Sequence, residues 1–109
     1  MRSGEDFRRT MRRGAKGAQP TLVSHVLLST SVPGTGGHTS VGFVVSKAVG
    51  SAVSRNRVKR QLRHLMRERV ASLPQGTKVV VRALPSSGGS ASSTLANDLD
   101  IALRKSGAR

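Results

Sequence analysis

Apolar and β-branched residues form three short runs along the chain, and these runs predict strands. Two of them, at residues 21–31 and 39–46, flank a glycine-rich segment at residues 33–37 that is typical of a loop. The two strands are therefore predicted to pair antiparallel with each other. A third strand is predicted at residues 78–83, followed by a Ser- and Gly-rich loop at residues 84–93.

The clearest helical pattern covers residues 54–71, with Ser54 as the predicted N-cap and Pro74 beyond the end. Apolar residues recur at helical spacing on one face, at Val58, Leu62, Leu65 and Met66. The remaining arc is almost wholly basic and carries Arg57, Lys59, Arg60, Arg63, His64 and Arg67. The helix is therefore predicted to pack on the core with one face and to expose positive charge on the other.

Two further helices complete the predicted order. One covers residues 4–14, where Phe7 and Met11 lie one above the other on the same face. The last begins at Ser93 or Thr94 and has an apolar face formed by Leu95, Leu99, Ala102 and Leu103. Helices and strands in this order predict an α+β fold, a small two-layer sandwich with helices packed on a sheet.

Length and composition restrict the possibilities. With 109 residues, of which 36% are hydrophobic, the chain is expected to form one domain, residues 1–109, around an aliphatic core. The absence of cysteine excludes disulfides, thiolate metal sites and cysteine nucleophiles. No apolar run is long enough to cross a bilayer, and residues 1–7 lack the apolar stretch of a secretory signal. We expect a cytoplasmic protein with no membrane partner and no small-molecule substrate.

Charge indicates the kind of partner. The chain has 19 Lys and Arg against 5 Asp and Glu, a formal net charge of +14. A compact domain with this charge repels itself unless a polyanion lies against it, and nucleic acid is the leading candidate, ahead of an anionic membrane surface. Arg55, Lys59 and Arg63 follow one another at intervals of one helical turn, about 5–6 Å, which suits contacts with successive phosphates.

Three motifs follow one another in the middle of the chain. Residues 41–47 have the sequence V-G-F-V-V-S-K, residues 49–53 V-G-S-A-V, and residues 55–60 R-N-R-V-K-R. In type and spacing these motifs closely resemble the protein subunit of bacterial ribonuclease P. The resemblance continues, more loosely, at residues 5–7, Gly14 and residues 78–83.

This resemblance implies an α-β-β-β-α-β-α sandwich of the ribosomal protein S5 domain 2-like type, with a left-handed βαβ crossover that presents the basic helix. It also implies that catalysis belongs to an RNA subunit, which uses Mg²⁺ to hydrolyse one phosphodiester and to release the 5′ leader of precursor tRNA. The protein assists as an accessory subunit, and its partners are the catalytic RNA and precursor tRNA.

Carried over by position, the resemblance implies two binding surfaces. The RNA subunit would be bound by Lys47, Arg55, Asn56, Arg57, Lys59, Arg60, Arg63 and Arg67. The single-stranded leader would lie in a cleft between the sheet and the first helix, lined by Phe7, Met11, His25, Phe43 and Val44. Met11 and His25 stand where family members usually carry aromatic residues, and both are weaker platforms for stacking a base.

Catalysis by the protein's own side chains has little support in the sequence. The acids are scattered, which argues against a two-metal carboxylate site, and Asp98 and Asp100 are predicted to be solvated. Neither His38 nor His64 is predicted to have a carboxylate that would orient it as a general base. We therefore expect neither a catalytic residue nor a metal site in the protein itself.

Three alternative functions would also suit a small, strongly basic domain. Another RNA-binding protein of the same fold, such as a ribosomal protein, would be equally basic but would lack the cleft. A DNA-binding regulator needs a short helix and a tight turn before its recognition helix, where this chain has a strand. A membrane-surface helix carries bulky apolar anchors that this helix lacks. Preference for a single-stranded leader and structured RNA over duplex DNA is the observation that separates these alternatives.

Overall fold

The computed structural model describes residues 4–28 and 39–108. In chain order it contains α1 (Gly4–Arg13), β1 (Ala15–Ala18), β2 (Leu22–Leu27), β3 (Ser40–Val44), α2 (Ala52–Arg69), β4 (Lys78–Ala83) and α3 (Ser92–Lys105), with 3₁₀ turns η1 (Lys47–Val49), η2 (Val70–Ser72) and η3 (Pro85–Gly89). This order is the α-β-β-β-α-β-α arrangement that the resemblance implies. The predicted loop at 33–37 and His38 lie outside the described residues.

The four strands form one sheet in the order β1-β2-β4-β3. β2 is antiparallel to β1 and to β4, whereas β3 is parallel to β4. The predicted antiparallel pair of β2 with β3 is therefore wrong, because β4 lies between them. Strand β4 takes an interior position because both of its faces have to be covered. Its residues Val79, Val80 and Val81 alternate between the two faces, and all three are completely buried.

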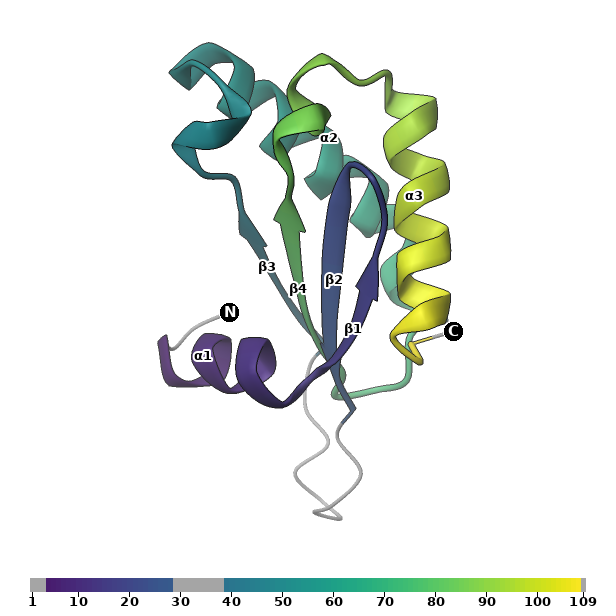
Figure 1. The fold of residues 1–109 in the computed structure, drawn as a ribbon. Helices are drawn as coiled ribbons and strands as arrows, with labels where there is room; N and C mark the ends of the chain where they lie inside the picture. The colour runs from purple at the N-terminus through teal and green to yellow at the C-terminus, as the bar shows by residue number, and fades with distance from the viewer. Residues whose placement is uncertain (1–3, 29–38, 109) are drawn as a thin grey trace.

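The connection from β3 to β4 is a left-handed crossover. Both strands point upwards in Figure 1, β4 lies to the right of β3, and the connecting helix α2 lies behind the sheet. Right-handed crossovers make up about 98% of such connections, so the unusual hand is a specific feature of this fold. It places α2 on the face of the sheet opposite α1.

The core lies between the sheet and the two longer helices. Strands β2 and β4 contribute Leu22, Val26, Val79, Val81 and Ala83, α2 contributes Val58, Leu62, Leu65 and Met66, and α3 contributes Leu95, Leu99, Ala102 and Leu103. These are the apolar faces predicted for both helices. Among the described residues, no helix is long and apolar enough to cross a membrane.

The start of α2 differs from the prediction by one turn. Ser51 is the N-cap, and its hydroxyl oxygen accepts a hydrogen bond from the backbone N–H of Ser54 at 3.2 Å. The prediction that Ser54 caps the helix is therefore wrong. Ser54 instead donates its N–H to the true cap, since the helix begins at Ala52, directly after η1 and Gly50.

Two acidic residues of α3 also differ from the prediction, because both have partners within the protein. Asp98 is 6% exposed and accepts hydrogen bonds from the backbone N–H of Thr21 at 3.2 Å and from its hydroxyl at 2.7 Å. Asp100 accepts hydrogen bonds from the guanidinium of Arg69 at 2.7 and 3.2 Å. Neither is a freely solvated charge, and each ties α3 to another element.

We expect Asp98→Ala to lower the free energy of unfolding by about 1–3 kcal/mol, since two buried donors of Thr21 lose their acceptor. Urea unfolding followed by circular dichroism measures the change. Asn97→Ala is the matched control, because Asn97 is the exposed neighbour of Asp98 on the same helix. Equal losses for the two variants would contradict a role for the Thr21 hydrogen bonds.

Candidate nucleic-acid interface

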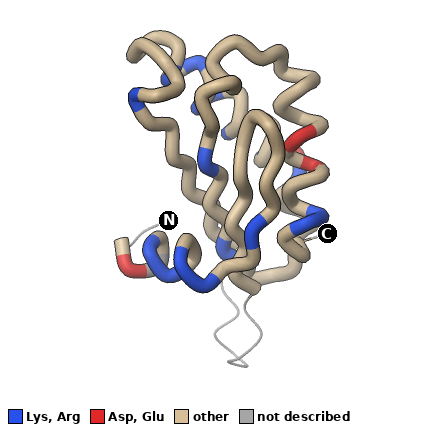
Figure 2. The backbone as a smooth tube through the Cα atoms, in the orientation of Figure 1, with Lys and Arg blue, Asp and Glu red and all other residues tan. Residues whose placement is uncertain are grey.

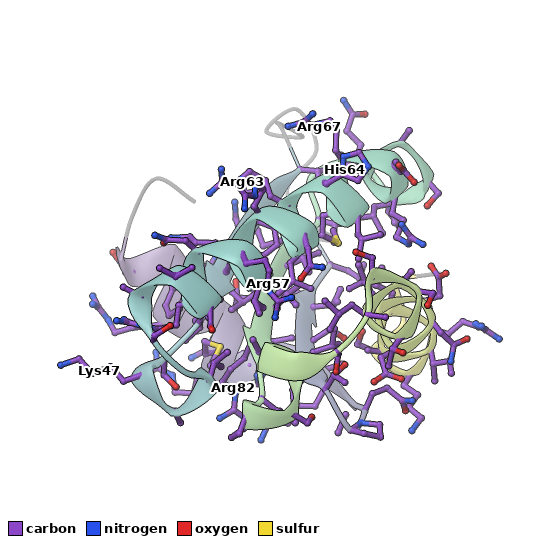
Figure 3. All side chains as sticks on the ribbon, turned by 90° about the horizontal axis from the view of Figure 1, so that it is seen from above. Lys47, Arg57, Arg63, His64, Arg67 and Arg82 are labelled. Carbon is purple, nitrogen blue, oxygen red and sulfur yellow. The ribbon has the colours of Figure 1, made fainter. Side chains whose placement is uncertain are left out.

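The exposed side of α2 carries the basic residues predicted from its periodicity. Besides Arg57, four cations and one amide are exposed along it: Asn56, Lys59, Arg60, Arg63 and Arg67. In Figure 3, Arg63 and Arg67 project from α2 away from the sheet and from α3. Helical spacing brings these residues together because the apolar residues of the same helix occupy the side that packs on the core.

Lys47 extends this surface beyond the helix. It is exposed in η1, just before α2, and points away from the body of the protein in Figure 3. The residues that we call the α2 basic surface are therefore Lys47, Asn56, Lys59, Arg60, Arg63 and Arg67.

Two predicted members of this surface are placed differently. Arg57 is exposed, but its guanidinium donates a hydrogen bond to the carbonyl oxygen of Gly88, so it is turned towards η3. Arg55 is half-buried, and its Nε atom is buried without a hydrogen-bond partner among the described residues. Arg57 thus has a structural contact, and only part of Arg55 is available to a ligand.

Little negative charge offsets the α2 basic surface. Glu68 is the only acidic residue of α2, and it lies 3.2 Å from Nε2 of His64 and 3.9 Å from Arg69. The prediction that His64 has no orienting carboxylate is therefore wrong, because Glu68 follows one helical turn later. The side chains of His64 and Glu68 are 67% and 61% exposed, so water surrounds the pair and it forms no enclosed catalytic site.

A second candidate surface lies on the other side of the sheet, where α1 packs. In α1, Thr10 is buried while Phe7 and Met11 are half-buried, so this side of the helix faces the sheet. On the strands, alternation puts His25 and Val44 on the same side as α1, which we call the α1 face.

The sequence prediction put Phe43 in the same cleft as Val44, and the structure contradicts this. Phe43 packs against the core on the α2 side of the sheet. Adjacent residues of a strand point to opposite faces, so Phe43 and Val44 cannot line one surface. The α1 face therefore brings together four of the five predicted residues.

His25 is the most unusual residue of the α1 face. It is 2% exposed, and neither ring nitrogen has a hydrogen-bond partner among the described residues. Lys16 of β1 is its direct partner in the sheet, and Arg82 of β4 lies diagonally across from it. Burial, together with the charges of Arg82 and Lys16, lowers the pKa of His25 below its usual 6.5.

Sequence reasoning missed Lys16 and Arg82. Lys16 lies in a short strand outside every motif, and Arg82 lies in the strand at residues 78–83, which resembles the family only loosely. The strand register is the signal that brings them together, and it depends on the placement of β4 between β2 and β3.

The lowered pKa of His25 predicts that stability depends on pH. The unfolded chain binds a proton near pH 6.5, whereas the folded protein resists protonation until lower pH. The contribution to stability is therefore complete above about pH 6.5 and declines as the pH falls towards the lowered pKa. Comparing urea midpoints at pH 7.5 and 5.5 tests this, and His25→Leu should reduce the difference. If the urea midpoints of His25→Leu differed between the two pH values as much as those of the unmodified protein, His25 would not cause the pH dependence.

Comparisons with known proteins agree with this architecture. The Staphylococcus aureus RNase P protein superposes with a TM-score of 0.83 at 22% identity, covering 99% of this chain and 94% of that one. The ribonuclease P protein component of Streptomyces avermitilis is 52% identical over 96% of this chain and 89% of its own length. That of a Nocardioides species is 48% identical over 99% and 91%. The Ribonuclease P family model matches residues 1–107.

The chain belongs to the ribonuclease P protein family. It is accordingly a protein component of ribonuclease P, an RNA-binding part of a ribonucleoprotein of tRNA processing. The resemblance inferred from the three motifs at residues 41–60 is confirmed, as is the fold. In this ribonuclease P protein, the α2 basic surface and the α1 face lie on opposite sides of one sheet.

Proposed function

We propose that this ribonuclease P protein binds the catalytic RNA subunit through the α2 basic surface and the single-stranded 5′ leader of precursor tRNA on the α1 face. In this way it assists the Mg²⁺-dependent removal of the leader. The observation that carries the proposal is the exposed arc of Lys59, Arg60 and Arg63, which has a single acid, Glu68, on the same helix. Such an arc attracts a phosphate backbone and gains from the release of its counterions.

The assisting role follows from charge neutralisation. Two RNA molecules that meet at an active site repel each other through their phosphates, and divalent ions are needed to offset that repulsion. Cations on both sides of the sheet neutralise part of this charge, so the complex assembles at a lower magnesium concentration. In Figure 2, Lys and Arg follow one another along α1.

The α1 face suits a flexible single strand better than a duplex. Phe7 is half-exposed and offers a ring for stacking a base, worth about 1–3 kcal/mol for a good stack. Met11 adds an apolar contact one turn further along α1. Val44 lies on the same face, whereas Phe43 belongs to the core and takes no part in leader binding.

In this proposal the RNA, and not the protein, binds the magnesium ions. The described residues contain no group of three or more His, Cys, Asp or Glu side chains that could hold a metal ion. Asn56 and the cations beside it would act by positioning phosphates of the RNA.

The test is cleavage of a precursor tRNA at low magnesium by the ribonuclease P RNA of the same organism, with and without the protein. We expect leader release at low magnesium only when both are present. Binding of the RNA without any stimulation of cleavage would instead support a structural RNA-binding protein.

A further inference from the structure

The α1 face carries two cations that lie outside the three motifs at residues 41–60. Lys16 of β1 lies beside His25 of β2. On the other side of His25, Val80 of β4 is its partner, and Arg82 lies two residues further along β4. The backbone of β2 therefore runs between the two cations. With strands about 4.8 Å apart, Lys16 and Arg82 are separated by two strand spacings across the sheet, within reach of neighbouring phosphates of one strand.

Unsatisfied polar atoms accompany these cations. Both ring nitrogens of His25 and the Nε atom of Arg82 are buried without a hydrogen-bond partner among the described residues. A buried polar group without a partner costs free energy, and such groups are rare in folded proteins. A neutral imidazole offers one donor and one acceptor, so His25 would gain from a ligand with polar oxygens.

The positive charge of this region favours a negatively charged ligand. Burial, followed by the positive charges of Arg82 and Lys16, lowers the pKa of His25, as expected for a ring that two cations flank. Helix α1, which packs on β2 and β4, adds the exposed cations Arg8 and Arg12. In Figure 1, α1 crosses the lower end of the sheet, and no described helix covers this face at the end of β4 where Arg82 lies.

We propose that Lys16 and Arg82, on either side of His25, bind phosphate groups of the single-stranded leader. This inference rests on the proposed function, and it adds two phosphate-binding residues on the face opposite the α2 basic surface. Arg82 suits the role because a planar guanidinium binds two phosphate oxygens at once. His25 lies between the two cations on the same face of the sheet.

The experiment uses the assembled complex of RNA subunit and protein, with Arg82→Gln and Lys16→Gln compared with the unmodified protein. Two ligands are measured: precursor tRNA with its leader, and mature tRNA without one. We expect each variant to weaken binding of precursor tRNA about tenfold and to leave mature tRNA unchanged. The slope of log affinity against log salt should fall by about 0.7 per variant.

Arg104→Gln is the matched control, because Arg104 is exposed on α3 and its loss removes the same charge. It should change neither affinity. Lys16 is exposed, so its variant is expected to fold even if Arg82→Gln does not, and circular dichroism checks both.

Equal losses for both ligands, or no loss for either, would overturn the inference. Stimulation of cleavage by the unmodified protein is measured in parallel. If stimulation is present and the variants show no leader-dependent loss, only this inference fails. If stimulation is absent, the proposed function itself fails.

Discussion

Replacing Lys59, Arg60 and Arg63 together with glutamine is expected to weaken binding of the ribonuclease P RNA by about a hundredfold to a thousandfold. All three are exposed on α2 and point into solvent on the side away from the core. Each loses a charge-assisted hydrogen bond to phosphate and the counterion release that accompanies it. Titrations of the RNA subunit at several salt concentrations measure the loss, and the salt slope should fall by about two to three.

The control for this triple variant removes the same charge from another place. Arg8, Arg12 and Arg13 are exposed on α1, on the opposite side of the sheet, and their replacement with glutamine also lowers the net charge by three. We expect this variant to keep most of its affinity for the RNA subunit. A loss as large as that of the α2 variant would show that net charge, and not the α2 basic surface, determines binding.

Gly17→Val is expected to lower the free energy of unfolding by about 3 kcal/mol or more. Gly17 of β1 is packed against the backbone of α3, so a Cβ atom there would overlap the carbonyl oxygen of Ala102 and lie 2.8 Å from its carbonyl carbon. Backbone atoms cannot rotate away, so α3 would have to separate from the sheet and lose packing at Leu99 and Leu103. Urea unfolding measures the change.

Gly89→Ala is the comparison that separates this clash from a general effect of replacing glycine. A Cβ atom at Gly89 meets nothing within 4 Å, and we expect a change of no more than about 0.5 kcal/mol. If Gly17→Val were as mild as Gly89→Ala, the close approach of β1 and α3 would not contribute to stability in solution.

The elements that the sequence predicted well are those whose pattern is local. The apolar face of α2 and the boundaries of β4 can be found from spacing alone, because a helix or a buried strand repeats its environment within a few residues. Strand β1 has no such pattern. It needs a glycine at position 17 because α3 packs closely there, and this contact is visible only in the fold.

The candidate site likewise contains residues that a local pattern predicts and residues whose contacts depend on the fold. Exposure of Lys59, Arg60 and Arg63 follows from helical periodicity, so these residues were predicted correctly to be exposed. The hydrogen bond from Arg57 to Gly88 joins residues far apart in sequence, which no local pattern shows. The same holds for Asp98, which accepts two hydrogen bonds from Thr21, the residue directly before β2.

The left-handed crossover has a consequence for the thickness of the protein between its two partners. Because it places α2 and α1 on opposite faces of one sheet, a helix, a sheet and a second helix separate the outer surface of α2 from that of α1. With helices and sheets packing about 10 Å apart, this stack measures roughly 20 Å between helix axes. The protein would therefore act as a rigid spacer that holds the leader at a constant distance from the RNA bound to α2.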